Sequence, residues 1–358
     1  MVRRNALWVF ILLCVITQEV KPSPSENLRT AFIASQTSLG IGLYSWLLPA
    51  GLGLKDEGAL ALGLWTPAIA LGGSYIATSN KRISGGTAYL SFIGGIDGCI
   101  HGVLLNSEHV RNSYTLPLIL SLTENIGGAI LAHKIGITPG IAQRKANYSV
   151  NGYYHTALIS TITDADFSSR IYGLVSLIEG YGSLLLTRND YKTTWGDALF
   201  ESVTSGIGAA EGWLCVLTAD LINDEIDLDI KAYTAFSLVG NVAGCGLGYL
   251  LSQRKDLTSF GGILTAFGPI IANGMVAGTL LLLNVTEPMV YPVLLAIGLP
   301  LTTWAIYRTQ AKPEEDENVM RTKNINLGFY FNPYPLIFNK KFNLQKVQAP
   351  LLALELRF

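Results

Sequence analysis

Five carboxylates lie within apolar stretches of this 358-residue chain, where ionisable groups are uncommon: Asp97, Glu124, Glu179, Glu201 and Glu211. The cations Arg144 and Lys145 lie in a less apolar stretch between them. A charge inside an apolar helix is costly unless it is paired or faces a cavity, so these carboxylates are candidates for a polar path for an ion or a small molecule. The alternative is that they lie at a membrane interface or on a solvated face of a helical bundle.

The four histidines do not form a metal motif, because none has a second histidine four residues away or a nearby cluster of cysteines and carboxylates. Asp97 and His101 are four residues apart and would share one face of a helix as a proton-sensitive pair. The sequence contains no P-loop and no Gly-x-Ser-x-Gly nucleophile motif. We therefore expect no enzyme activity, no cofactor and no metal.

The elements that must position these side chains are repeated. Four times a glycine is followed twelve residues later by a second glycine, and four residues after that by another small residue. The first glycines of these sets are 54, 56 and 66 residues apart (86 to 140, 140 to 196, 196 to 262). Such spacing predicts an array of about four similar units. The sets are Gly86, Gly98, Gly102; Gly140, Gly152, Thr156; Gly196, Gly208, Gly212; and Gly262, Gly274, Gly278.

Each unit is predicted to be a hairpin, with a first helix, a polar turn and a second helix. The first helices are expected near Gly63–Ala77, Leu116–Ala132, Tyr172–Leu186 and Tyr233–Leu251. Three second helices begin after Ser84, Thr138 or Thr194, whose hydroxyls are suited to capping free N–H groups. The fourth is expected to be capped by Thr258 or Ser259.

Glycines four residues apart give these helices smooth faces, which allow two backbones to approach closely. The close approach offsets the cost of about 1 kcal/mol that each glycine adds inside a helix. We predict that the following residues pack helix against helix: Gly73, Gly94, Gly98, Gly102, Gly128, Gly152, Gly182, Gly208, Gly212, Gly240, Gly244, Gly248, Gly274 and Gly278.

Charges differ between the two kinds of turn. Turns after first helices are basic, as in Lys81-Arg82, whereas turns after second helices are acidic or neutral, as in Asp164 and Asp166. If the helices cross a bilayer, the basic turns belong on the cytoplasmic side. The apolar stretch Met289–Ile306 would then be one more helix running in the same direction as the first helices.

Both ends of the chain differ from the repeat. Residues 1–24 have the plan of a signal peptide, 25–58 form an apolar helical segment, and 59–310 hold the hairpins. A charged linker at 311–323 precedes a tail, 324–358, whose alternating residues predict a short antiparallel β segment. The closing residues Leu352 to Phe358 resemble the last strand of bacterial outer-membrane barrels, which implies a bacterial cell envelope.

The sequence thus predicts a mainly α protein of glycine-rich hairpins with a short β tail. With 14% charged residues and mean hydropathy +0.36, the chain is apolar for a soluble protein, and its net charge of −1 shows no basic footprint for nucleic acid. We expect a non-enzymatic component of a bacterial envelope membrane, inner or outer, with a structural or assembly role. Membrane lipid is the expected partner, with self-association or a protein partner also open. A transporter or channel, and a soluble periplasmic scaffold, are the alternatives.

Overall fold

A computed structural model describes residues 24–106, 113–188, 190, 193–222, 228–253, 256–287 and 289–311. These residues are mainly helical, as expected. The predicted signal peptide, charged linker and β tail lie outside the described residues, apart from Pro24 and Ala311 at their edges. Their predicted structures therefore stay predictions.

The chain enters the described region through two helices that lie against the bundle. Helix α2 (Pro24–Leu39) and helix α3 (Ser45–Gly51) are joined by a short π-helical segment, Gly40–Tyr44. Helix α2 packs on α4 (Asp56–Ala77) and on α5 (Gly85–Leu105). Buried apolar side chains from these elements, with Leu118 from the following helix, form one core cluster: Leu39, Tyr44, Leu47, Phe92, Cys99 and Leu118.

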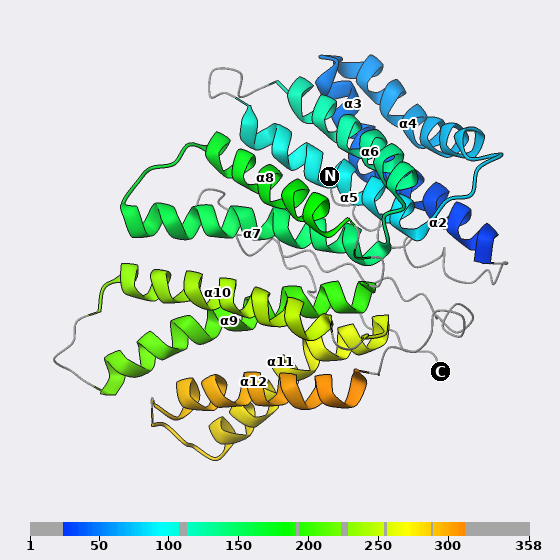
Figure 1. The fold of residues 1–358 in the computed structure, drawn as a ribbon. Helices are drawn as coiled ribbons and strands as arrows, with labels where there is room; N and C mark the ends of the chain where they lie inside the picture. The colour runs from blue at the N-terminus through cyan, green and yellow to red at the C-terminus, as the bar shows by residue number, and fades with distance from the viewer. Residues whose placement is uncertain are drawn as a thin grey trace. The chain divides into compact units, whose positions relative to one another are not determined.

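The rest of the described chain consists of further helices that stack in chain order, as Figure 1 shows. They are α6 (Thr115–Ile135), α7 (Pro139–Thr163), α8 (Ser169–Thr187), α9 (Trp195–Ile222), α10 (Ile230–Ser252), α11 (Ser259–Leu282) and α12 (Val290–Gln310). The closely packed pairs are α5 with α6, α7 with α8, α9 with α10, and α11 with α12. The predicted pairing is therefore wrong by one helix. Each hairpin is a second helix followed by the first helix of the next unit, and α4 packs instead on α2 and α3.

The second helices of the sequence repeat, α5, α7, α9 and α11, begin with equivalent caps. Ser84, Thr138, Thr194 and Thr258 each accept a hydrogen bond from the backbone N–H three residues later. The caps are 54, 56 and 64 residues apart (84 to 138, 138 to 194, 194 to 258). The glycines of the fourth repeat, spaced by 66 residues, thus lie two residues out of register with its cap.

Glycines in the first turns bring the capped ends of these helices together. A Cβ at Gly86 would overlap the carbonyl of Ile137, one at Gly140 that of Thr193, and one at Gly196 that of Leu257. Each of these carbonyls belongs to the residue just before the next cap. The capped ends therefore lie side by side at one end of the stack (Figure 1).

Ten of the fourteen glycines predicted to pack do lie against another helix, and all ten belong to the pairs α5–α6, α7–α8 and α9–α10. A Cβ at Gly152, for example, would lie 2.6 Å from the Cα of Ser176 on α8. The prediction is wrong for Gly73, Gly182, Gly274 and Gly278, where a Cβ would meet nothing within 4 Å. Gly274 and Gly278 do not contact another helix because the glycines of the fourth repeat lie two residues out of register with its cap. Counted from the cap, the position of Gly98, Gly152 and Gly208 is Ala272 in α11.

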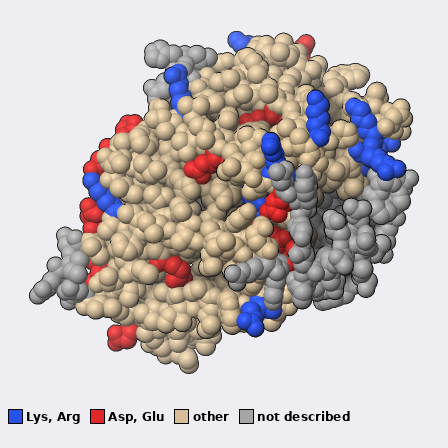
Figure 2. All heavy atoms as spheres, in the orientation of Figure 1, with Lys and Arg blue, Asp and Glu red and all other residues tan. Residues whose placement is uncertain are grey.

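Among the described residues, seven helices are long and apolar enough to cross a membrane: α4, α5, α6, α9, α10, α11 and α12. Large apolar side chains point outward from them, including Leu64, Trp65 and Ile76 on α4 and Leu282 on α11. Uncharged residues cover most of the face drawn in Figure 2. The described chain is therefore that of a membrane-embedded helical protein.

Candidate functional site

Helices α5, α7, α9 and α11 each bury a polar residue seven positions after the cap. These residues are Ser91, Lys145, Glu201 and Thr265, and none is more than 2% exposed. Ser91 donates to Asn125 of α6, while Thr265 donates to its own helix. In α7 and α9 this position carries a charge, so a network of charged side chains forms around the middle of the array.

Lys145 lies at the centre of the first part of this network. Its Nζ is 2.7 Å from Oδ2 of Asp97 on α5 and 3.2 Å from Oε2 of Glu124 on α6. It also lies 4.8 Å from the centre of the Tyr181 ring on α8, and the hydroxyl of Tyr181 donates to Glu124 over 3.0 Å. All three charged groups are buried, so one ammonium group joins four helices through mutually satisfied charges.

Glu124 also contacts His101, whose ring is fully buried. Oε1 of Glu124 lies 2.6 Å from Nδ1 of His101, and Nε2 of the same ring lies 3.0 Å from Oγ of Ser176 on α8. The predicted pair of His101 and Asp97 is therefore wrong, because the carboxylate that His101 contacts is Glu124. Asp97 binds Lys145, and the carboxylate on the next helix binds the histidine.

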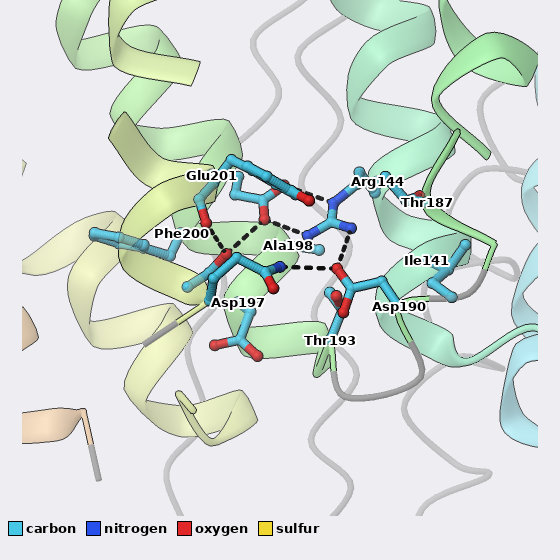
Figure 3. Close-up of polar contacts among 12 residues, drawn as sticks. Ile141, Arg144, Thr187, Asp190, Thr193, Asp197, Ala198, Phe200 and Glu201 are labelled. Atoms are coloured by element: carbon cyan, nitrogen blue, oxygen red, sulfur yellow. Dashed lines mark hydrogen bonds and ion pairs between the residues drawn. The ribbon is translucent and has the colours of Figure 1, made fainter. Parts of the chain in front are cut away.

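The adjacent residue Arg144 makes the corresponding contacts toward the opposite side of α7. Its guanidinium binds Glu201 of α9 through two nitrogens, with Nε 2.7 Å from Oε2, and its Nη1 donates to Asp190 over 3.0 Å (Figure 3). Ser252 of α10 completes the site by donating to Glu201 over 2.8 Å. Arg144 and Lys145 together connect α7 to the hairpins on both sides.

Asp190 lies in the connection between α8 and α9, and its environment predicts a pH effect. Burial alone would raise the pKa of this carboxyl, but hydrogen bonds from its side-chain neighbours, Arg144 and Gln253 among them, hold it below its usual value. A lowered folded-state pKa gives stability that is complete above about pH 4 and is lost as the pH falls through the folded-state value.

We expect Asp190→Asn to lower the free energy of unfolding by about 1 kcal/mol at neutral pH, because a partly buried charge-assisted hydrogen bond to Arg144 is weakened. Thermal unfolding in detergent, measured for wild type and variant from neutral to acidic pH, checks this. The difference should shrink as Asp190 becomes protonated. A difference that stays constant down to the lowest pH would contradict the role given to its charge.

A third group of polar residues repeats the histidine–glutamate contact one hairpin later. Nδ1 of His155 on α7 lies 3.0 Å from both carboxylate oxygens of Glu179 on α8. Its Nε2 lies 2.8 Å from Oδ1 of Asn241 on α10. The side chains of His155 and Glu179 are 17% and 25% exposed, so this pair is less enclosed than His101 and Glu124.

The predicted polar path thus divides into separate groups. Asp97 and Glu124 share Lys145, Glu201 binds Arg144, and Glu179 binds His155. Glu211 belongs to none of them, and among the described residues its Oε1 has no hydrogen-bond partner. The alternative of a solvated face is wrong for Asp97, Glu124 and Glu201, which are at most 6% exposed.

Several residues that take part in these buried polar groups were not predicted as site residues from the sequence: Arg144, Lys145, His155, Ser176, Tyr181 and Asn241. A usable signal existed for the histidines. His101 and His155 both lie seventeen residues after a cap, Ser84 and Thr138 respectively. Counting from caps rather than from glycines would have placed them at one repeated position.

Within the described residues, no three His, Cys, Asp or Glu side chains are grouped to hold a metal ion. Cys99 is buried, Cys245 is half-buried and Cys215 is exposed, and all three are free thiols. No family model, no curated protein and no solved structure matches this chain.

Proposed function

We propose that this protein is a non-enzymatic structural or assembly component of a bacterial cell-envelope membrane. The observation that carries the proposal is the placement of Arg144 and Lys145. Both are almost fully buried, and both are bound by carboxylates from neighbouring hairpins. Charges satisfied in this way hold helices in one arrangement and leave no unpaired ammonium or guanidinium for a ligand.

The bacterial origin and the envelope location rest on the ends of the sequence, namely the signal-like start and the closing alternating residues. The membrane itself is supported by the seven apolar helices and their outward-facing large side chains. A soluble scaffold would have to expose these side chains to water, which soluble monomers rarely do over a large contiguous patch. Lipid is therefore the partner that this surface favours.

A transporter or channel is the second candidate, and the buried carboxylates favour it. Charged residues inside membrane helices commonly mark ion or proton paths. In this reading, a cation would compete with Lys145 for Asp97 and Glu124. The structural proposal instead requires Lys145 to stay bound to both of them.

Two measurements separate the candidates. We expect the protein to stay with the membrane after alkaline carbonate and to need detergent for release, which a soluble scaffold would not. In proteoliposomes with an entrapped pH- or cation-sensitive dye, we expect no more flux than in empty liposomes. Flux that depends on the protein and is abolished by Asp97→Asn in a folded variant would replace the structural proposal with the transporter.

A further inference from the structure

The hydrogen bonds around His101 determine which of its ring nitrogens carries a proton. Ser176 has one hydroxyl hydrogen, and it donates this hydrogen to the backbone carbonyl of Ser149 over 2.7 Å. The Ser176 oxygen can then only accept from the histidine, so Nε2 of His101 must be an N–H group.

The other ring nitrogen then requires a second proton. Nδ1 lies 2.6 Å from Oε1 of Glu124, and an ionised carboxylate can only accept hydrogen bonds. A neutral histidine with its hydrogen on Nε2 would place a lone pair against that oxygen in a fully buried site. One proton must therefore lie between Nδ1 and Oε1, on the ring or on the carboxyl group.

The same assignment of hydrogens to the two ring nitrogens holds for His155. Nδ2 of Asn241 donates to the backbone carbonyl of Ser205 over 3.3 Å, which fixes the orientation of the amide and presents Oδ1 to the histidine. An amide oxygen only accepts, so Nε2 of His155 carries a hydrogen. Nδ1 faces both oxygens of Glu179, and this contact again requires a proton.

Charge balance gives the same result at the more buried site. His101 contacts Glu124 on α6, Tyr153 on α7 and Ser176 on α8, while Lys145 on α7 binds both Glu124 and Asp97. With the shared proton, the negative charges of Asp97 and Glu124 are balanced by the Lys145 ammonium group and by that proton. Without it, the interior would hold one uncompensated negative charge, which is strongly unfavourable.

The two sites occupy one position of the repeat. His101 and His155 each lie seventeen residues after the cap, and each binds the glutamate of the other helix in its own hairpin. The remaining nitrogen binds the next hairpin, through Ser176 for His101 and Asn241 for His155. The same position in α9 is Glu211.

We propose that this protein binds two protons in its interior, one between His101 and Glu124 and one between His155 and Glu179, and that each bound proton joins neighbouring hairpins. The His155 ring contacts Glu179 on α8, Asn241 on α10 and Tyr154 on its own helix. The inference does not depend on the structural role proposed above, since a transporter would need the same protons at these atoms.

The test is nuclear magnetic resonance of the full-length protein, labelled with ¹⁵N-histidine and reconstituted in lipid, at about pH 8, above the ordinary range of imidazole. His101→Gln and His155→Gln assign the signals. We expect both nitrogens of His101 and His155 to report bound protons, or isotope-edited infrared spectra to show a protonated carboxyl at the partner glutamate. The exposed His133 serves as the internal reference.

Glutamine variants give matched controls because an amide can donate to Nδ1. In Glu124→Gln, His101 should become neutral with its hydrogen on Nε2, while the His155 signals stay unchanged. Glu179→Gln should do the reverse, and its partly exposed site provides a second measurement if Glu124→Gln folds poorly. Neutral histidines beside ionised Glu124 and Glu179 in the wild type at pH 8 would overturn the proposal.

Discussion

Replacing Lys145 with methionine is expected to destabilise the protein by about 3–5 kcal/mol, because Asp97 and Glu124 would lose the cation that they share in a buried site. Methionine has a similar length, so the loss of the charge should outweigh the change in packing. Thermal or denaturant unfolding in detergent measures the effect. Lys134→Met, at an exposed position in the last turn of α6, should change the stability by less than about 0.5 kcal/mol.

A second substitution separates charge from shape. Lys145→Met combined with Asp97→Asn restores neutrality, since the shared proton of His101 and Glu124 then balances the remaining carboxylate. We expect the double variant to recover at least about half of the loss, as a coupling energy between two residues in contact. If the double variant is no more stable than Lys145→Met alone, the buried charge is not the cause of the loss.

Substitution of Gly208 by alanine is the second large effect that we expect. A Cβ at Gly208 would overlap the carbonyl oxygen of Gly240 and lie 3.1 Å from the Cα of Gly244, so α9 and α10 would have to separate. Neither neighbour is a flexible side chain that can move aside. We expect a loss on the order of 2–3 kcal/mol in the free energy of unfolding.

Gly206, two residues earlier on α9, is the matched control, because a Cβ there would meet nothing within 4 Å. Gly206→Ala should be neutral or stabilising by up to about 1 kcal/mol, through the better helix propensity of alanine. The pair of variants therefore predicts effects of opposite direction on one helix. Equal destabilisation by both would show that close packing of α9 on α10 does not determine the result.

The helices were predictable from the sequence because their signals are local. Cap hydroxyls, apolar stretches and glycine spacing each lie within one helix, and they gave the type and approximate bounds of the repeated elements. The pairing was not predictable in this way. A repeat of first and second helices has the same spacing whichever turn closes the hairpin. The pairing is therefore visible only in contacts between helices, such as that of Gly98 with α6 rather than with α4.

The site was less accessible for a related reason. The sequence shows Asp97 in an apolar stretch, but its partner Lys145 is 48 residues away on α7. No local pattern connects the two, because the contact depends on α5 and α7 lying side by side. Glu201 and Arg144, 57 residues apart, illustrate the same limit.

Because the glycines of the fourth repeat lie two residues out of register with its cap, the hairpin of α11 and α12 packs differently from the hairpins before it. Without glycines at the matching positions, α11 and α12 lack the backbone-to-backbone glycine contacts that join α9 and α10, and among the described residues this last hairpin has neighbours on one side alone. In a linear array each unit depends on the units next to it. We therefore expect the hairpin of α11 and α12 to be the least stable of the described hairpins.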